Sequence, residues 1–163
     1  MKQGPVNKML VYIDGSEESI TAAEYSVVLS KKMGAELYAI YVINTRALDD
    51  LVKSRIFLQI EEEEYKRDLE SDADRYLNHV KELATKKGVA INLIKKSGNV
   101  HAELKKSVQE NDIDLLVLGE LAHVRSRRDE FYNEAERAMR IVDCSVMIVK
   151  DEEKVWELYE ALE

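Results

Sequence analysis

The sequence is poor in cysteine, with Cys144 as the single thiol among 163 residues. One cysteine excludes an internal disulfide framework and suits a reducing compartment such as the cytosol. The N-terminus, MKQGPVNKM, lacks the apolar stretch of a secretion signal. No apolar run approaches the roughly 20 residues that a membrane-spanning helix needs. We therefore expect a cytoplasmic protein without a membrane segment.

Positive charge is also in short supply. The chain has 24 lysines and arginines against 32 aspartates and glutamates, which gives a formal net charge of −8. Nucleic-acid binding needs a basic face for the phosphates, so this balance argues against a nucleic-acid partner. What is present is an ordinary globular composition, 45% hydrophobic and 34% charged. A chain of this length can form one domain with a real core and is too short for two comfortable ones.

Short apolar runs alternate with segments of helical spacing along most of the chain. Strands are expected at 8–13, 37–43, 89–94, 115–118 and 146–149. Helices are expected from about 17 to 33, 61 to 87, 100 to 110 and 131 to 142. All the strand runs except 89–94 are nearly continuous in apolar residues, as strands buried on both faces should be. This alternation predicts the α/β class, with a parallel sheet covered by helices on both faces.

Local signals mark several boundaries between these elements. Asp14 and Gly15 form a turn signal after the first strand, and Ser16 can cap the helix that follows. Gly34 is a suitable residue to end that helix. A second turn is expected at 97–99. The first strand and first helix are therefore well delimited.

The last residues of the chain form one more helical pattern. Its apolar residues share one face, namely Val155, Leu158, Tyr159 and Leu162. This stripe must rest either on its own domain or on a second subunit, and the sequence does not choose between the two. We expect one domain over residues 1–150, with 151–163 as a helical tail that is not a separate domain.

Three segments occur in a specific order and spacing. The first is a strand, an Asp-Gly-Ser turn, a helix and a strand, MLVYIDGSEESITAAEYSVVLSKKMGAELYAIYVI. The second is a glycine-containing turn, a helix and a strand, SGNVHAELKKSVQENDIDLLVLG. The third is an Ala-Glu-Arg helix, a cysteine and a Val-rich strand, NEAERAMRIVDCSVMIVK. Together they resemble the universal stress protein family over about residues 8–150.

The resemblance implies a particular sheet and a particular site. The expected fold is a five-stranded parallel sheet in the order 3-2-1-4-5, Rossmann-like and similar to adenine-nucleotide α-hydrolase folds. In that order the topological switch lies between strands one and four, where Asp14 and Gly119 face one crevice. In nucleotide-binding members, the aspartate after strand one and main-chain atoms at the end of strand two contact adenine or ribose. The matching positions here are Asp14 and Val42.

The phosphate-binding motif of the family is damaged in this chain. The family pattern Gly-x2-Gly-x9-Gly-Ser/Thr falls on Gly119, Ala122, Tyr132 and Asn133. Tyr132 would fill space that a phosphate needs, and Tyr12 replaces a proline common in the first strand. These departures are similar to the branch typified by UspA, which lacks the motif. If a nucleotide binds, the implied positions are Asp14, Gly15, Val42, Gly119, Ala122, Arg125 and Asn133.

Charged residues near the motif leave an alternative open. Arg125, Arg127 and Arg128 could hold an anion without glycines, by bidentate hydrogen bonds. The plainer interpretation is a solvated loop whose arginines pair with Asp129 and Glu130.

No catalytic residue and no metal site is predicted. His79, His101 and His123 are far apart in sequence and have no paired ligand spacing or obvious nucleophilic partner, so surface or turn positions are expected. The glutamates at 61–64 suit a solvated helix start, since consecutive helical residues point in different directions. Cys144 is most simply a packed small hydrophobic residue, with redox sensing as the alternative.

The function implied by the resemblance is stress protection by binding and signalling, without catalysis and without a cofactor. The alternative is an ATP-binding member that acts as a nucleotide-dependent switch or slow ATPase, although no Walker-type loop or general base is present. A homodimer is expected through strand 145–149, which lies at the sheet edge and would bury Val146 and Ile148.

Overall fold

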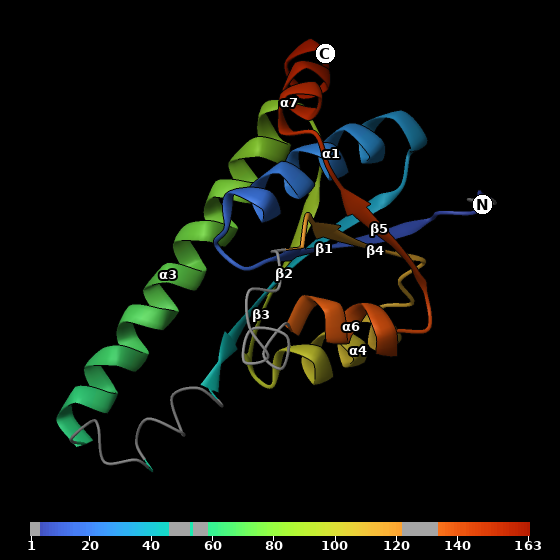
Figure 1. Cartoon of the computed structure of the whole chain (residues 1–163). Helices are drawn as coiled ribbons and strands as arrows, with labels where there is room; N and C mark the ends of the chain where they lie inside the picture. Colours follow the sequence, from blue (N-terminus) through green and yellow to red (C-terminus); the bar gives the residue numbers. More distant parts are fainter. Residues whose placement is uncertain (1–3, 46–52, 54–58, 122–133) are drawn as a thin grey trace.

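The computed structural model describes residues 4–45, 53, 59–121 and 134–163. Its sheet has five parallel strands in the order β3-β2-β1-β4-β5, which confirms the predicted topology (Figure 1). The strands are β1 (Lys8–Ile13), β2 (Glu36–Asn44), β3 (Ile91–Gly98), β4 (Leu115–Gly119) and β5 (Ser145–Val149). Chain winding reverses between β1 and β4, so their carboxyl ends form the switch point.

Alternate side chains of the central strands enter two separate cores. Met9, Val11 and Ile13 of β1 belong to one core, whereas Leu10 and Tyr12 belong to the other. This alternation follows from the two-residue period of a strand. Both sets are apolar because helices cover both faces of the sheet, as the continuous apolar runs predict.

Three described helices cover the first face and two cover the second. The first face carries α1 (Glu17–Met33), α3 (Gln59–Lys86) and α7 (Glu152–Ala161), and the second carries α4 (Val100–Glu110) and α6 (Glu134–Ile141). The expected start and end of α1 are confirmed. The Ser16 hydroxyl accepts a hydrogen bond from the Ser19 N–H, and Gly34 ends the helix with φ 69°.

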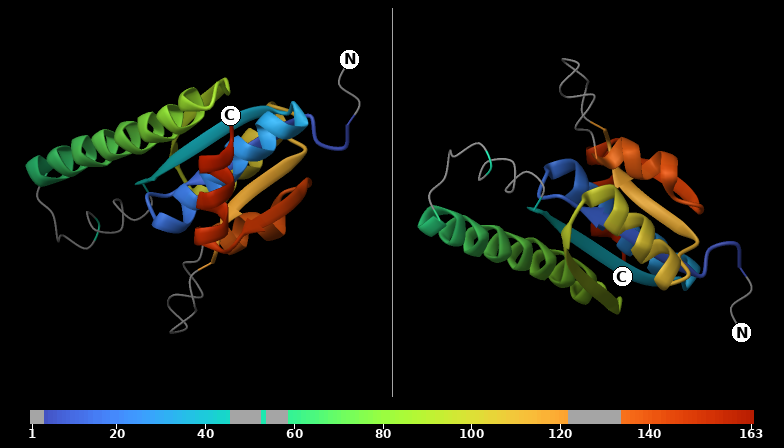
Figure 2. Two further views of the ribbon diagram at one scale, coloured as in Figure 1. Left: turned by 90° about the horizontal axis from the view of Figure 1, so that it is seen from above. Right: turned by 90° about the horizontal axis from the view of Figure 1, so that it is seen from below.

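Helix α3 reaches beyond the body of the domain. Its buried residues begin at Ala73, while Tyr65 is 38% exposed. The N-terminal half of the helix projects past the sheet (Figures 1 and 2). Helical spacing therefore predicted the helix itself correctly, but only the C-terminal half of its apolar stripe has a core to enter.

Two boundaries differ from the sequence prediction. The sequence predicts β3 at 89–94 with a turn at 97–99, whereas the strand begins at Ile91 and runs to Gly98. The longer β2 supplies the reason, because it pairs with β3 up to Asn44 opposite Gly98 and so extends the ladder through the expected turn. β3 is only half-buried, as its mixed sequence predicts. The expected helix 131–142 is described only as α6, and its first residues lie outside the described part.

The C-terminal helix α7 packs on its own domain. It lies across α1 beside the end of α3 (Figure 2). Val155, Tyr159 and Leu162 are at most 6% exposed, and the Tyr159 hydroxyl donates a 2.7 Å hydrogen bond to the carbonyl of Leu83 in α3. Leu158 was predicted on the buried face and is 40% exposed, since the contact with α1 and α3 covers a narrower stripe.

Candidate functional site

The β1–α1 turn stands at the switch point and is held by its own side chains. The Asp14 carboxylate accepts hydrogen bonds from the backbone N–H of Ser16, at 2.9 Å, and from the Ser16 hydroxyl. Gly15 has φ 86°, a backbone conformation that favours glycine. Asp14 therefore serves the turn and the start of α1, in addition to any ligand that the crevice holds.

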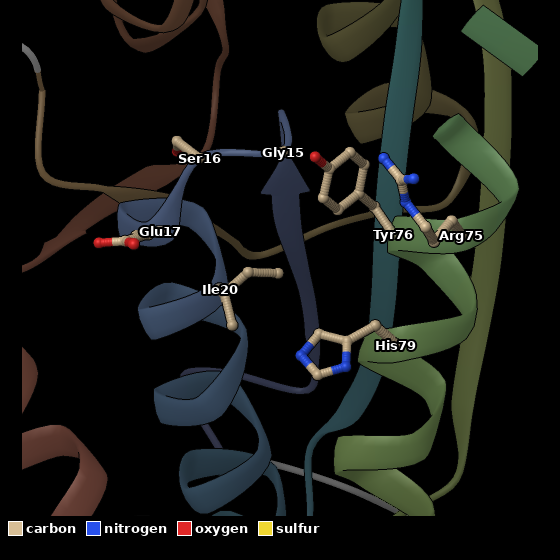
Figure 3. A pocket seen from close by; sticks show the side chains of 7 residues that line it. All are labelled: Gly15, Ser16, Glu17, Ile20, Arg75, Tyr76 and His79. Carbon is tan, nitrogen blue, oxygen red and sulfur yellow. The ribbon is translucent and has the colours of Figure 1, made fainter. Parts of the chain in front are cut away.

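An open cleft of about 390 Å³ lies beside this turn, between α1 and α3 (Figure 3). Tyr76 and His79 project from α3 towards α1, where Ile20 faces them. A Cβ built on Gly15 would lie 2.9 Å from the Tyr76 ring, so the glycine lets this ring pack against the turn. The lining residues are Gly15, Ser16, Glu17, Ile20, Arg75, Tyr76 and His79.

The α3 wall of the cleft is built from the rings of Tyr76 and His79 and the guanidinium group of Arg75, and Tyr41 of β2 supports the Tyr76 ring without lining the cleft. The rings of Tyr41 and Tyr76 stack with centroids 6.0 Å apart and an interplanar angle of 9°. Arg75 lies 5.1 Å from the Tyr76 ring centroid and pairs with Asp72 at 3.0 Å. Such a wall suits a small ligand with a flat apolar part and an anionic substituent. Burial raises the pKa of Tyr41, so its phenol is no base at neutral pH.

The other face of the switch point is filled by a tyrosine. Tyr12 points into the core beneath α4 and α6 and is 8% exposed. Burial raises the pKa of Tyr12, and the carboxylate charges of Asp14 and Glu134 add to the rise. The phenol therefore stays protonated over the physiological range, and Val42 is buried in the same core cluster.

An acid–imidazole pair joins the helices on this face. His101 is the second residue of α4 and Glu134 is the first described residue of α6, and the His101 Nδ1 lies 2.7 Å from the Glu134 Oε2. The His101 backbone N–H also donates to this oxygen, at 3.2 Å. The sequence predicts a surface or turn position for His101, whereas the structure places it half-buried in the first turn of α4, with a carboxylate partner that the sequence analysis did not identify. The two residues are 33 positions apart in sequence. The sequence feature that could have predicted their contact is that both lie near the start of helices that cover the same face of the sheet.

Gly119 is fixed by packing at the end of β4. A Cβ built there would lie 2.5 Å from the carbonyl carbon and oxygen of Glu18 in α1. The close approach of α1 to β4 requires a glycine at this position, whether or not a ligand binds. Packing of α1 against β4 therefore explains why this position of the family motif is still a glycine, although the other motif positions differ.

The remaining predicted residues are placed as follows. Val146 and Ile148 are half-buried on β5, which lies at the sheet edge. The side chains of Ala122, Arg125, Arg127, Arg128, Tyr132 and Asn133 lie outside the described residues. Of the implied nucleotide positions, the structure thus brings together Asp14, Gly15 and Gly119 at the switch point and places Val42 in the same buried cluster as Tyr12.

Redox and metal chemistry find little support in the described residues. Cys144 is half-buried, and burial raises the pKa of its thiol, which disfavours the reactive thiolate. Within the described ranges, no group of three or more His, Cys, Asp or Glu side chains is arranged to hold a metal ion. The same ranges contain no helix that is both long and apolar enough to span a membrane.

Comparison with known proteins gives a consistent result. A sequence model described as "Universal stress protein family" matches residues 5–150. The chain is 28% identical, over 147 residues, to universal stress protein MJ0531 of Methanocaldococcus jannaschii, covering 90% of this chain and 84% of that one.

Solved structures are similar in fold. A universal stress protein family member from Burkholderia pseudomallei has a TM-score of 0.70 at 20% identity, covering 91% of this chain and 99% of the other. A family protein from Arabidopsis thaliana, solved with AMP bound, has a TM-score of 0.61 at 15% identity, with coverages of 91% and 94%. At these identities the likeness concerns the fold.

Proposed function

This chain belongs to the universal stress protein family, and from that membership we propose that it is a non-enzymatic stress-response domain. In this proposal it pairs with a second copy and binds a protein partner or a weakly held ligand, without turning over a substrate. The cytoplasm is the proposed place of action, and the single, half-buried cysteine supports it.

The start of α6 carries the proposal. In an open α/β sheet, the N-terminus of the helix that follows a switch-point strand is where a ligand phosphate would be stabilised. The described part of α6 begins at Glu134, whose carboxylate lies 2.7 Å from the imidazole of His101. An anion of the protein thus stands in the first described turn of α6, close enough to the buried Tyr12 to raise its pKa. Both features oppose a nucleotide.

Calorimetry with ATP and magnesium tests this proposal. We expect weak or undetectable binding by the unaltered protein, because a nucleotide phosphate would meet the Glu134 charge and because the Tyr12 ring fills the adjoining space. A dissociation constant in the low micromolar range would overturn the expectation. Changing Arg125, Arg127 and Arg128 together to alanine would then abolish the binding if an arginine site is responsible.

A charge variant sharpens the same experiment. Glu134→Gln keeps an acceptor for His101 and removes the negative charge, so ATP should bind several-fold more tightly than to the unaltered protein. The reason is that a unit charge a few ångströms away contributes about 1 kcal/mol in water-like surroundings. The matched control is Glu136→Gln on the same helix, where Glu136 pairs with Arg140 at 2.9 Å and no change is expected.

A nucleotide-dependent switch is the second candidate function. The observation that favours it is the similarity to the AMP-bound protein from Arabidopsis thaliana. The open cleft between α1 and α3 offers a further place for a flat, anionic ligand. The calorimetric experiment separates the two candidates.

A further inference from the structure

Glu24 is a buried carboxylate on α1. It lies midway along the helix, and its side chain is 7% exposed. Helix α7 crosses α1, as Figure 2 shows, and covers a side of α1 that would otherwise be open to solvent. A glutamate at such an interface is uncommon, because burying an ionised carboxylate without a partner is costly.

Within the described part of the chain, the charges that act on the pKa of Glu24 are those of other carboxylates. Its Oε2 is fully buried and has no hydrogen-bond partner among the described residues. The carboxylates of Glu152 and Glu160 approach from α7, together with the phenol of Tyr159. On the α3 side, the ammonium group of Lys87 lies over the Tyr159 ring, at 4.9 Å, and donates to the carbonyl of Leu162.

We propose that α7 is a pH-sensitive strap: protonated Glu24 lets it lie closed on α1, and ionisation of Glu24 loosens it. Burial raises the pKa of Glu24 to about 7, and the charges of Glu152 and Glu160 add to the rise. With α7 released, Glu24 is hydrated and its pKa returns towards the ordinary value of 4.5. The strap lies outside the part of the chain that the family model covers, since α7 begins at Glu152 and the match ends at residue 150.

The direction of the pH effect follows from these two pKa values. The closed state binds the Glu24 proton more tightly than the released state, so closure is most favourable below about pH 4.5. The contribution of Glu24 protonation to closure is lost progressively as the pH rises from about 4.5 to about 7. Above that pH, the closing equilibrium no longer depends on Glu24 titration. Acidification therefore closes the strap, and neutral to alkaline pH loosens it. Between about pH 5 and about pH 8 the closing equilibrium should fall by about one to two orders of magnitude.

Amide hydrogen exchange on the full chain tests the proposal. Protection of the amides of α7, corrected for the intrinsic rates and compared with α4 in the same molecule, should fall by about that factor between the two pH values. In Glu24→Gln, which is neutral throughout, the protection of α7 should stay constant. The matched control Glu157→Gln removes an exposed carboxylate from α7 and should keep the pH dependence of the unaltered protein.

Fluorescence gives a second readout in the same variants. Trp156 is the single tryptophan of the chain, and its ring stacks on Tyr159, with centroids 5.9 Å apart. Its emission should change with pH in step with the exchange of α7, and this change should be absent in Glu24→Gln. The proposal is overturned if α7 protection is independent of pH in the unaltered protein, or if Glu24→Gln retains the full pH dependence.

Discussion

Gly119 shows how strongly a single position can be constrained by packing. The backbone of Glu18 occupies the place where a side chain at residue 119 would begin. A backbone contact cannot be relieved by rotating a flexible side chain, so α1 itself would have to move. The glycine is therefore needed for stability, quite apart from any role towards a ligand.

Replacing Gly119 by alanine should lower the free energy of unfolding by about 1–3 kcal/mol, the usual cost of overpacking a tight contact. Denaturant unfolding at constant m-value would measure the loss. The matched control is Gly4→Ala, where a Cβ would meet its nearest atom, the carbonyl oxygen of Val6, at an ordinary 3.9 Å. Unchanged stability in Gly119→Ala would show that α1 can shift at little cost and that packing does not require the glycine.

At the scale of elements, α7 gives the clearest case of tertiary anchoring. A ten-residue helix is too short to be stable alone in water, so its order depends on the domain beneath it. Three buried side chains and the hydrogen bond from Tyr159 to the Leu83 carbonyl supply that support. The helix is thus a part of the domain core, although it lies outside the family match.

Tyr159→Phe should destabilise the protein by about 1–3 kcal/mol, because the carbonyl of Leu83 loses its hydroxyl donor in a buried setting. Thermal or denaturant unfolding would measure this loss. Tyr38→Phe is the matched control, since the Tyr38 hydroxyl donates to Glu36 at an exposed site and its removal should change stability little. Equal losses in the two variants would contradict a specific anchoring role for Tyr159.

At the scale of the whole molecule, the sheet has two edges, β3 and β5. An edge strand presents unpaired backbone groups, which proteins cover, shorten or pair with another chain. Here α7 leaves the end of β5 and turns onto α1. Val146 and Ile148 on β5 are only half-buried. This edge is the proposed place of pairing between two copies across a two-fold axis.

Light scattering should therefore show a dimer, and Val146→Lys should give a monomer, because the two-fold axis would bring two lysine charges together. Lys81→Ala, an exposed change on α3 away from this edge, is a control that should leave the dimer intact. A uniform monomer of the unaltered protein at tens of micromolar concentration would show that the β5 edge does not mediate pairing.

The sequence alone determined the sheet and the helices that follow its central strands. Continuous apolar runs marked β1, β2, β4 and β5, because a strand covered on both faces needs apolar side chains in both directions. Ser16 and Gly34 marked the limits of α1 by local capping, which involves only nearby residues. The strand order came from the resemblance of three segments to a family, and the structure confirms it.

The tertiary structure decided which polar residues meet and which are buried. No local pattern pairs His101 with Glu134, because that contact arises only when α4 and α6 lie side by side. The residues around Glu24 do not mark it as buried. The apolar face of α1 predicts burial on one side only, and it is α7 that covers a second side of the helix. Side-chain spacing within a segment is fixed by the chain, whereas burial and ionisation depend on elements that arrive from far away in sequence.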